Sequence, residues 1–213
     1  MPNWCGTTYR FEGDEKDIEI LKKAIREYRA YFKDYIDDKS IIYCNVAMFI
    51  DYCKDKNLFN KSEKNYECRG GIAYVDYSQS NIFELVIEDA WYPHPDFWFD
   101  LIEYNHWNIE VSYIAEEPGC EVYQKHGTRY EEKYYLDDET DLLNGGNSYF
   151  ITDKDLIKTV KKQIKNYLQS VDSDNIFDKN IKITTIEDIY TFIEKFNEKY
   201  PDMCLSLHEF EEV

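Results

Sequence analysis

Long apolar runs are absent from this sequence of 213 residues. No stretch approaches the roughly 20 apolar residues that cross a bilayer, and the N-terminus lacks the shorter apolar core of a signal peptide. The sequence therefore predicts a soluble, cytoplasmic protein with no membrane partner. Proline and glycine are also few, at 5 and 8 residues, and no flexible linker rich in these residues divides the chain.

Positive charge is scarce relative to negative charge, because 25 Lys and Arg stand against 43 Asp and Glu, for a net charge of -18. A high net charge can indicate disorder, but the 20 Tyr and 12 Phe of this chain are typical of a folded protein. The length is sufficient to bury the core of one domain, or of one domain with an extension. We interpret the chain as a folded acidic protein.

Signatures of catalysis and of metal binding are missing. The cysteines form no C-x-x-C pair and the histidines form no H-E-x-x-H pair; these residues are Cys5, Cys44, Cys53, Cys68, Cys120, Cys204, His94, His106, His126 and His208. There is no nucleophile elbow, phosphate loop or dinucleotide fingerprint. Buried, reduced thiols are the simplest interpretation of the cysteines. The sequence therefore predicts a non-enzymatic protein with no metal and no cofactor.

Residues 1–149 have the pattern of an α+β domain. A strand ending at Gly13 precedes a helix from Asp14 to about Ile36, in which apolar residues recur at spacings of three and four. We interpret the segment 40–70 as an insertion and its first part, 40–56, as a helix. Two alternating runs around the turn SQSN then predict a hairpin.

A second helix is expected to start at Pro95 or Asp96 and to bury Phe97, Trp98, Leu101 and Ile102. Three strands should follow, in the stretches WNIEVSYIA, CEVYQKH and RYEEKYYLD. This order of elements predicts a ferredoxin-like split β-α-β sandwich, with an antiparallel sheet, helices on one face and the other face left open.

Residues 150–213 are expected to form a helical extension packed on the first domain. One helix should run from Thr152 to about Ser170 and another should begin with a capping box, Thr184 to Glu187. The tail MCLSLHEF could add an edge strand.

Three short motifs occur in the order MPNWC at the N-terminus, then AWYPHP, then EEPG. Together they resemble the YubB ferredoxin-like domain family of bacterial plasmids and phages, in which the second motif corresponds to an Ala-Trp-x-Pro-Pro corner and the third to a Glu-Pro-Gly turn. The resemblance covers residues 1–13 and 84–136. It implies the same fold and an origin on a mobile genetic element, and it implies no catalytic residue.

The segment EDAWYPHPDFWF, residues 88–99, allows two interpretations. As a structural corner, Trp91 ends a strand and packs beneath the next helix, while the two prolines fix the exit of the chain. As a small-ligand or peptide site, the corner would use Trp91, Tyr92, His94 and Trp98. We favour the structural corner.

Negative charge is concentrated in residues 84–139, which hold 15 Asp and Glu against three Lys and Arg, whereas residues 1–83 sum to -1. A surface of this kind repels nucleic acid and attracts basic proteins. We therefore predict an interaction protein that presents carboxylates to a basic groove of a host defence or nucleic-acid-handling protein such as a nuclease. The carboxylates proposed for this contact are Glu110, Glu116, Glu117, Glu121, Glu131, Glu132, Asp137 and Asp138. The alternatives are the small-ligand site above, an acidic surface that serves only solubility, and an unrecognised enzyme.

Overall fold

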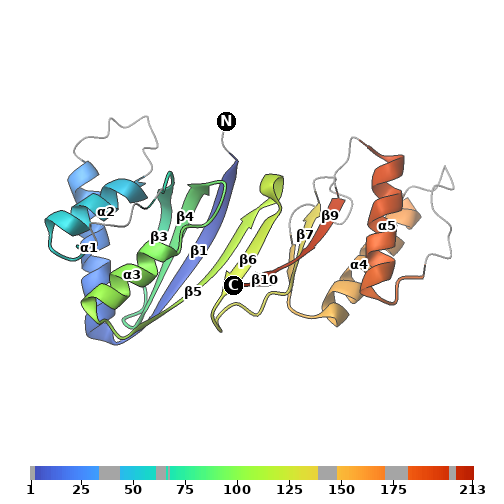
Figure 1. Ribbon diagram of the computed structural model, residues 1–213. Coiled ribbons are helices and arrows are strands. Elements are labelled where there is room, and N and C mark those ends of the chain that lie inside the picture. The colour runs from blue at the N-terminus through green and yellow to red at the C-terminus, as the bar shows by residue number, and fades with distance from the viewer. Residues whose placement is uncertain are drawn as a thin grey trace. The chain divides into compact units, whose positions relative to one another are not determined.

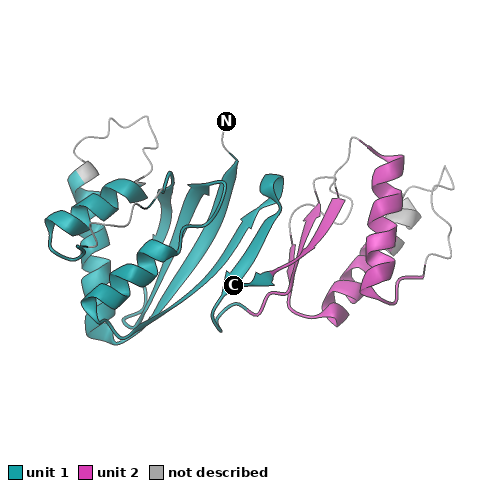
Figure 2. Ribbon diagram, viewed as in Figure 1, with its two compact units in different colours: residues 1–130, 211–213 teal, residues 131–210 magenta. Residues whose placement is uncertain are grey.

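The computed structural model (Figure 1) describes residues 3–33, 44–60, 66, 68–138, 148–170, 182–201 and 205–213. The chain divides into unit 1, residues 1–130 with 211–213, and unit 2, residues 131–210 (Figure 2). This division differs from the predicted boundary between residues 149 and 150. The difference arises because the strand over 134–138 pairs within unit 2, and because the last residues of the chain return to the sheet of unit 1.

Unit 1 is a seven-stranded sheet that carries three helices, α1, α2 and α3, on one face (Figure 1). Its elements are β1 (Trp4–Gly13), α1 (Glu15–Lys33), β2 (Cys44–Asn45), α2 (Val46–Asp55), β3 (Gly71–Asp76), β4 (Ile82–Ala90), α3 (Asp96–Asn105), β5 (Ile109–Glu117), the 3₁₀ turn η1 (Pro118–Cys120), β6 (Val122–His126) and β10 (Glu211–Glu212).

The strand order is β10-β6-β5-β1-β4-β3-β2, and the four strands β5, β1, β4 and β3 are antiparallel to their neighbours. In the β1-α1-β3 motif, β4 lies between the two strands, and in the β4-α3-β5 motif, β1 lies between them. This is a split β-α-β arrangement. The predicted α+β sandwich is confirmed. The helix expected over 40–56 begins only at Val46, where the Asn45 side chain accepts the Ala47 N–H at 2.8 Å; residues 34–43 lie outside the described residues.

The two faces of the sheet follow from the alternation of side chains along β1. Cys5, Thr7, Tyr9 and Phe11 are buried against the helices, whereas the residues between them are exposed or half-buried. No element of unit 1 covers the second face, among the parts of the chain that the structure describes. We call this second surface the helix-free face.

Trp98 of α3 lies at the centre of the core of unit 1 and is 1% exposed. Its ring centroid is 5.4 Å from that of Phe11, 6.0 Å from that of Tyr9, and 5.9 Å from that of Phe49 on α2. Aromatic pairs at these separations add to the free energy gained by burying their area. Trp98 therefore joins α3 to the central strand and to α2.

Unit 2 has its own three-stranded antiparallel sheet, in the order β8-β7-β9, and two helices (Figure 2). Its elements are β7 (Tyr134–Asp138), β8 (Ser148–Phe150), α4 (Asp153–Ser170), α5 (Ile186–Lys199) and β9 (Leu205–Glu209). Leu156 and Val160 of α4 and Ile189 and Phe196 of α5 are buried in a core with Leu136 of the sheet. Unit 2 is therefore an α+β unit rather than a purely helical extension, and the edge strand predicted in the tail is confirmed as β9.

The capping box of α5 lies one residue later than the sequence pattern predicts. Thr185 is the N-cap, and its hydroxyl accepts the Asp188 N–H at 3.2 Å. The Asp188 carboxylate in turn accepts the Thr184 N–H at 2.7 Å and the Thr185 N–H at 2.9 Å. These hydrogen bonds favour the ionised form and lower the pKa of Asp188 to about 2. The predicted cap at Thr152 is confirmed, because its hydroxyl accepts the Asp155 N–H at 3.2 Å.

Acid should remove the stabilisation that Asp188 gives to unit 2. Because its pKa in the folded state, about 2, lies below the usual value of about 3.9, the contribution is complete above pH 4 and is lost as the pH falls toward 2. Asp188→Asn is thus expected to lower Tm at pH 6 and to have little effect at pH 2. Thermal unfolding of the two proteins between these pH values measures the difference. Glu187→Gln, which removes a charge in the same helical turn, is the control, and an equal pH profile for both variants would contradict the prediction.

Candidate interaction surface

The three sequence motifs meet at one end of the sheet of unit 1. The carbonyl of Asn3 accepts the Trp91 N–H at 3.0 Å, and the Asn3 side-chain amide lies 3.8 Å from the sulfur of Cys120. A Cβ on Gly119 would collide with the Asn3 side chain, so the turn approaches the start of β1 closely. Segments far apart in the sequence thus form one contiguous corner.

Trp91 sits at the point where β4 ends, in a backbone conformation with φ of 77°. The Tyr92 N–H donates to the Ala90 carbonyl at 3.1 Å, across a single residue, which together with the positive φ is the geometry of a γ-turn. This turn leaves Trp91 and Tyr92 exposed, at 42% and 54%. The prediction that Trp91 packs beneath the helix is wrong, because Trp98 fills that position.

His94 faces the sheet. Its Nδ1 lies 3.6 Å from Oδ2 of Asp89, a residue that is 1% exposed on β4, and the two form an ion pair when the imidazole is protonated. Gly70 packs directly against the Asp89 carboxylate. Of the four aromatic-corner residues named from the sequence, Trp98 is therefore buried in the core, His94 is half-buried beside Asp89, and Trp91 and Tyr92 are exposed.

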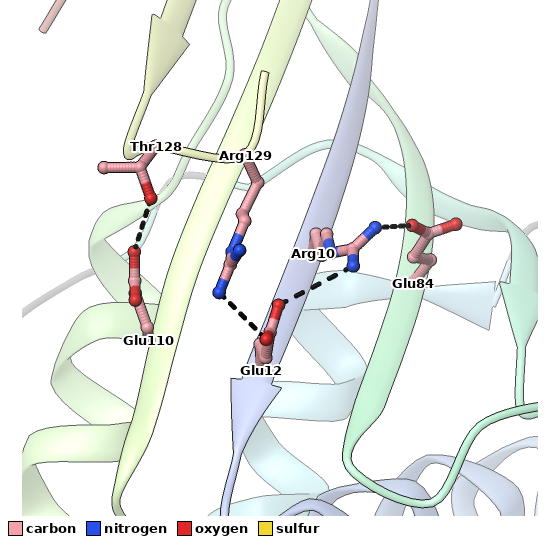
Figure 3. Close-up of polar contacts among 6 residues, drawn as sticks. All are labelled: Arg10, Glu12, Glu84, Glu110, Thr128 and Arg129. Atoms are coloured by element: carbon pink, nitrogen blue, oxygen red, sulfur yellow. Dashed lines mark hydrogen bonds and ion pairs between the residues drawn. The ribbon is translucent and has the colours of Figure 1, made fainter. Parts of the chain in front are cut away.

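A chain of polar contacts crosses the helix-free face (Figure 3). Arg10 of β1 binds Glu84 of β4 at 3.1 Å and lies 3.6 Å from Glu12 on its own strand. Glu12 also binds Arg129 at 2.8 Å. The neighbouring loop contributes a further contact, from the Thr128 hydroxyl to Glu110 of β5 at 3.3 Å.

The strand register gathers carboxylates on the helix-free face. Because residues paired across antiparallel strands share a face, Glu84 and Glu88 of β4 lie on the same side as Glu110 and Glu116 of β5 and Glu12 of β1. Three of the cations described there are engaged: Arg10 and Arg129 are in the network above, and Lys125 of β6 binds Glu212 at 3.1 Å. The unbalanced charge on this face is therefore negative.

The eight carboxylates named from the sequence do not form one exposed set. Glu117, Asp137 and Asp138 are buried, and Glu117 is the N-cap of η1, where its carboxylate accepts the Cys120 N–H. Glu110, Glu116 and Glu121 are exposed or half-buried in unit 1, whereas Glu131 and Glu132 belong to unit 2. Sequence reasoning missed Glu12, Glu84 and Glu88. The two-residue alternation of their strands was the signal, but it does not reveal which strands are neighbours.

Thiol chemistry is disfavoured by burial. Burial raises the pKa of Cys5 to about 12 and that of Cys68 to about 12, and it also raises the pKa of Cys53. A thiol acts as a nucleophile only when ionised, so these three groups are poor nucleophiles at neutral pH. Within the described ranges, no cluster of His, Cys, Asp and Glu could hold a metal ion.

These thiols are expected to resist alkylation in the folded protein. Iodoacetamide at pH 8 should modify the buried Cys5, Cys53 and Cys68 far more slowly than the half-buried Cys120. Mass spectrometry of peptides after timed exposure measures each rate, and the same reaction in urea gives the reference for accessible thiols. Rapid modification of Cys5 in the folded state would contradict this prediction and would indicate a reactive thiol.

Two cavities are lined by residues that the structure describes. One of about 380 Å³ is lined by residues of α1 and α2, including Tyr31 and Tyr52, and one of about 300 Å³ lies along α4. Neither contains a residue of the aromatic corner. In the portion of the chain that is described, no helix has both the length and the apolar character needed to cross a membrane.

Comparison with known proteins adds no assignment. No protein-family model, no curated protein and no solved structure matches this chain. The YubB resemblance and the ferredoxin-like name therefore stay predictions, which depend on the three motifs and on the strand order.

Proposed function

We propose that unit 1 is a non-enzymatic interaction module that binds a basic protein through its helix-free face. One observation carries the proposal: carboxylates from three adjacent strands share this face, while Arg10, Lys125 and Arg129 are paired with carboxylates of the same unit. Such a face offers little to a phosphate group, because phosphate binding needs unpaired Lys and Arg. It offers acceptors to Arg and Lys of a partner.

The partner is proposed to be a protein whose basic groove otherwise binds nucleic acid. Arginine recognises carboxylate and phosphate with the same bidentate geometry, so an acidic protein surface can compete for such a groove. The resemblance to a family of plasmids and phages supports a host defence nuclease or nucleoprotein as the target. In this proposal the carboxylates of the helix-free face act as a nucleic-acid mimic.

A paired capture experiment tests the proposal. Tagged wild-type protein and the variant E88K/E116K are exposed to a nuclease-treated bacterial lysate and washed across a salt series. A basic nucleic-acid-binding protein that is held by the wild type, released by salt and missing from the variant would support the proposal. Equal recovery on both proteins would show that the helix-free face is not the contact, and that its acidity serves solubility.

The exposed Trp91 and Tyr92 favour a peptide-binding function as the second candidate. Exposed aromatic side chains are enriched among residues that dominate binding. If a W91A/Y92A variant no longer captures the partner while E88K/E116K still does, the partner binds the aromatic corner and not the carboxylates.

A further inference from the structure

Gly6 leaves a gap in the layer of side chains on the helix-free face. It belongs to β1, the central strand, and no atom lies within 4 Å of the position that a Cβ would occupy there. Its two partners across the sheet are Glu88 on β4 and Glu116 on β5. Two carboxylates therefore flank an open position.

The local backbone gives no reason for a glycine. Gly6 pairs in regular register with both neighbouring strands, so it marks no bulge. The φ angle of Gly6 is not in the left-handed region that favours glycine, and an added Cβ would have no atom within 4 Å. Glycine weakens a strand interior, and where it marks neither a bulge nor a bend it commonly marks the close approach of a ligand or another chain.

The dimensions of the gap suit a flat cation. Neighbouring strands are about 4.8 Å apart, so the Cα atoms of Glu88 and Glu116 are separated by about 10 Å across Gly6. A guanidinium has donors along two edges and can bond to a carboxylate on each side. An ammonium is a compact point charge without this geometry.

Trp4 supplies an aromatic neighbour to the same gap. It lies two residues before Gly6 on β1, hence on the same face, and it is 49% exposed. A guanidinium stacks on an indole and is attracted to its face, in addition to bonding to carboxylates. One aromatic group and two carboxylates thus border a position that any side chain larger than hydrogen would fill.

From this arrangement we infer that Trp4, Gly6, Glu88 and Glu116 form an arginine slot, which takes the guanidinium of one arginine side chain from the partner. The inference rests on the proposed function and identifies the anchoring contact within it. Glycine at position 6 keeps the slot empty, Glu88 and Glu116 bind the guanidinium edges, and Trp4 covers its face.

The test fills the slot without changing any charge. Gly6→Val places a β-branched side chain in the gap, where there is space for it and where strands favour such residues. Binding of a nona-arginine peptide and of a nona-lysine peptide is measured by calorimetry for the wild type, Gly6→Val and E88K/E116K. Thermal unfolding verifies that each variant is folded, and Gly6→Val is expected to be at least as stable as the wild type.

We expect Gly6→Val to weaken nona-arginine binding by about tenfold and to reduce the preference for arginine over lysine to near one. Trp4→Ala should reduce the same preference. If Gly6→Val leaves the binding of both peptides unchanged while E88K/E116K weakens it, the inferred arginine slot is wrong, but the helix-free face still binds through its charge. If E88K/E116K also has no effect, the proposed function fails and the slot fails with it.

Discussion

Replacing Trp98 by alanine is expected to destabilise the protein by about 3–5 kcal/mol, the range for removing a large aromatic side chain from a packed core. Trp98 is 1% exposed, and its ring contacts aromatic rings of β1, α2 and α3. The substitution would leave a cavity where these elements meet. Because three elements border it, we expect the surrounding side chains to fill little of it by relaxing. Urea unfolding followed by circular dichroism measures the change.

Trp91→Ala provides the matched control. It removes the same side chain from the same corner, but Trp91 is 42% exposed, and substitutions at exposed positions usually change stability by less than about 0.5 kcal/mol. Equal destabilisation by the two substitutions would contradict the packing described for this corner, since it would mean that the exposed indole supports the fold as much as the buried one.

Reversing two charges on the helix-free face is expected to weaken binding of a basic partner by about 100-fold at low salt. Glu88→Lys with Glu116→Lys replaces two attractions by two repulsions, and close charge pairs at interfaces are worth about 1.5 kcal/mol or more each. The loss should shrink as salt rises, because screening weakens the repulsion as well as the attraction. Affinity for nona-arginine, or for a partner captured from lysate, is the quantity to measure.

The variant D55K/E103K separates local from global electrostatics. It changes the net charge by the same amount at exposed positions of α2 and α3, which are on the opposite side of the sheet. We expect it to weaken binding only slightly. If it weakens binding as much as E88K/E116K does, the partner senses the overall charge and not the helix-free face.

Local patterns in the sequence were sufficient to predict most elements of unit 1. The period of the apolar residues identified α1, and the proline-marked start of α3 correctly placed Phe97 and Trp98 in the core. The alternating runs around SQSN identified the hairpin of β3 and β4. These signals are readable because each depends on residues a few positions apart.

The candidate site depended instead on information that no single segment contains. The placement of Glu88 beside Gly6 and Glu116 follows from the register of three strands, which is fixed by tertiary pairing. The side-chain direction of Trp91 follows from a γ-turn that the prolines did not predict. The assignment of Tyr134–Asp138 to the first domain failed for the same reason, because the sequence of a strand does not indicate which sheet it will join.

The path of the chain through the two units has a consequence for folding entropy. Unit 2 is inserted between β6 and β10, so closing β10 onto β6 requires residues 131–210 to bring their ends together. In folded unit 2, Tyr134 pairs with Glu209 and the Phe210 N–H donates to the Lys133 carbonyl, which holds those ends side by side. Loop-closure cost rises by about 0.6 kcal/mol for each doubling of loop length. Folding of unit 2 thus shortens the effective loop roughly tenfold, or by about three doublings. The entropic cost of pairing β10 with β6 falls by about 2 kcal/mol as a result, although β10 is not part of unit 2.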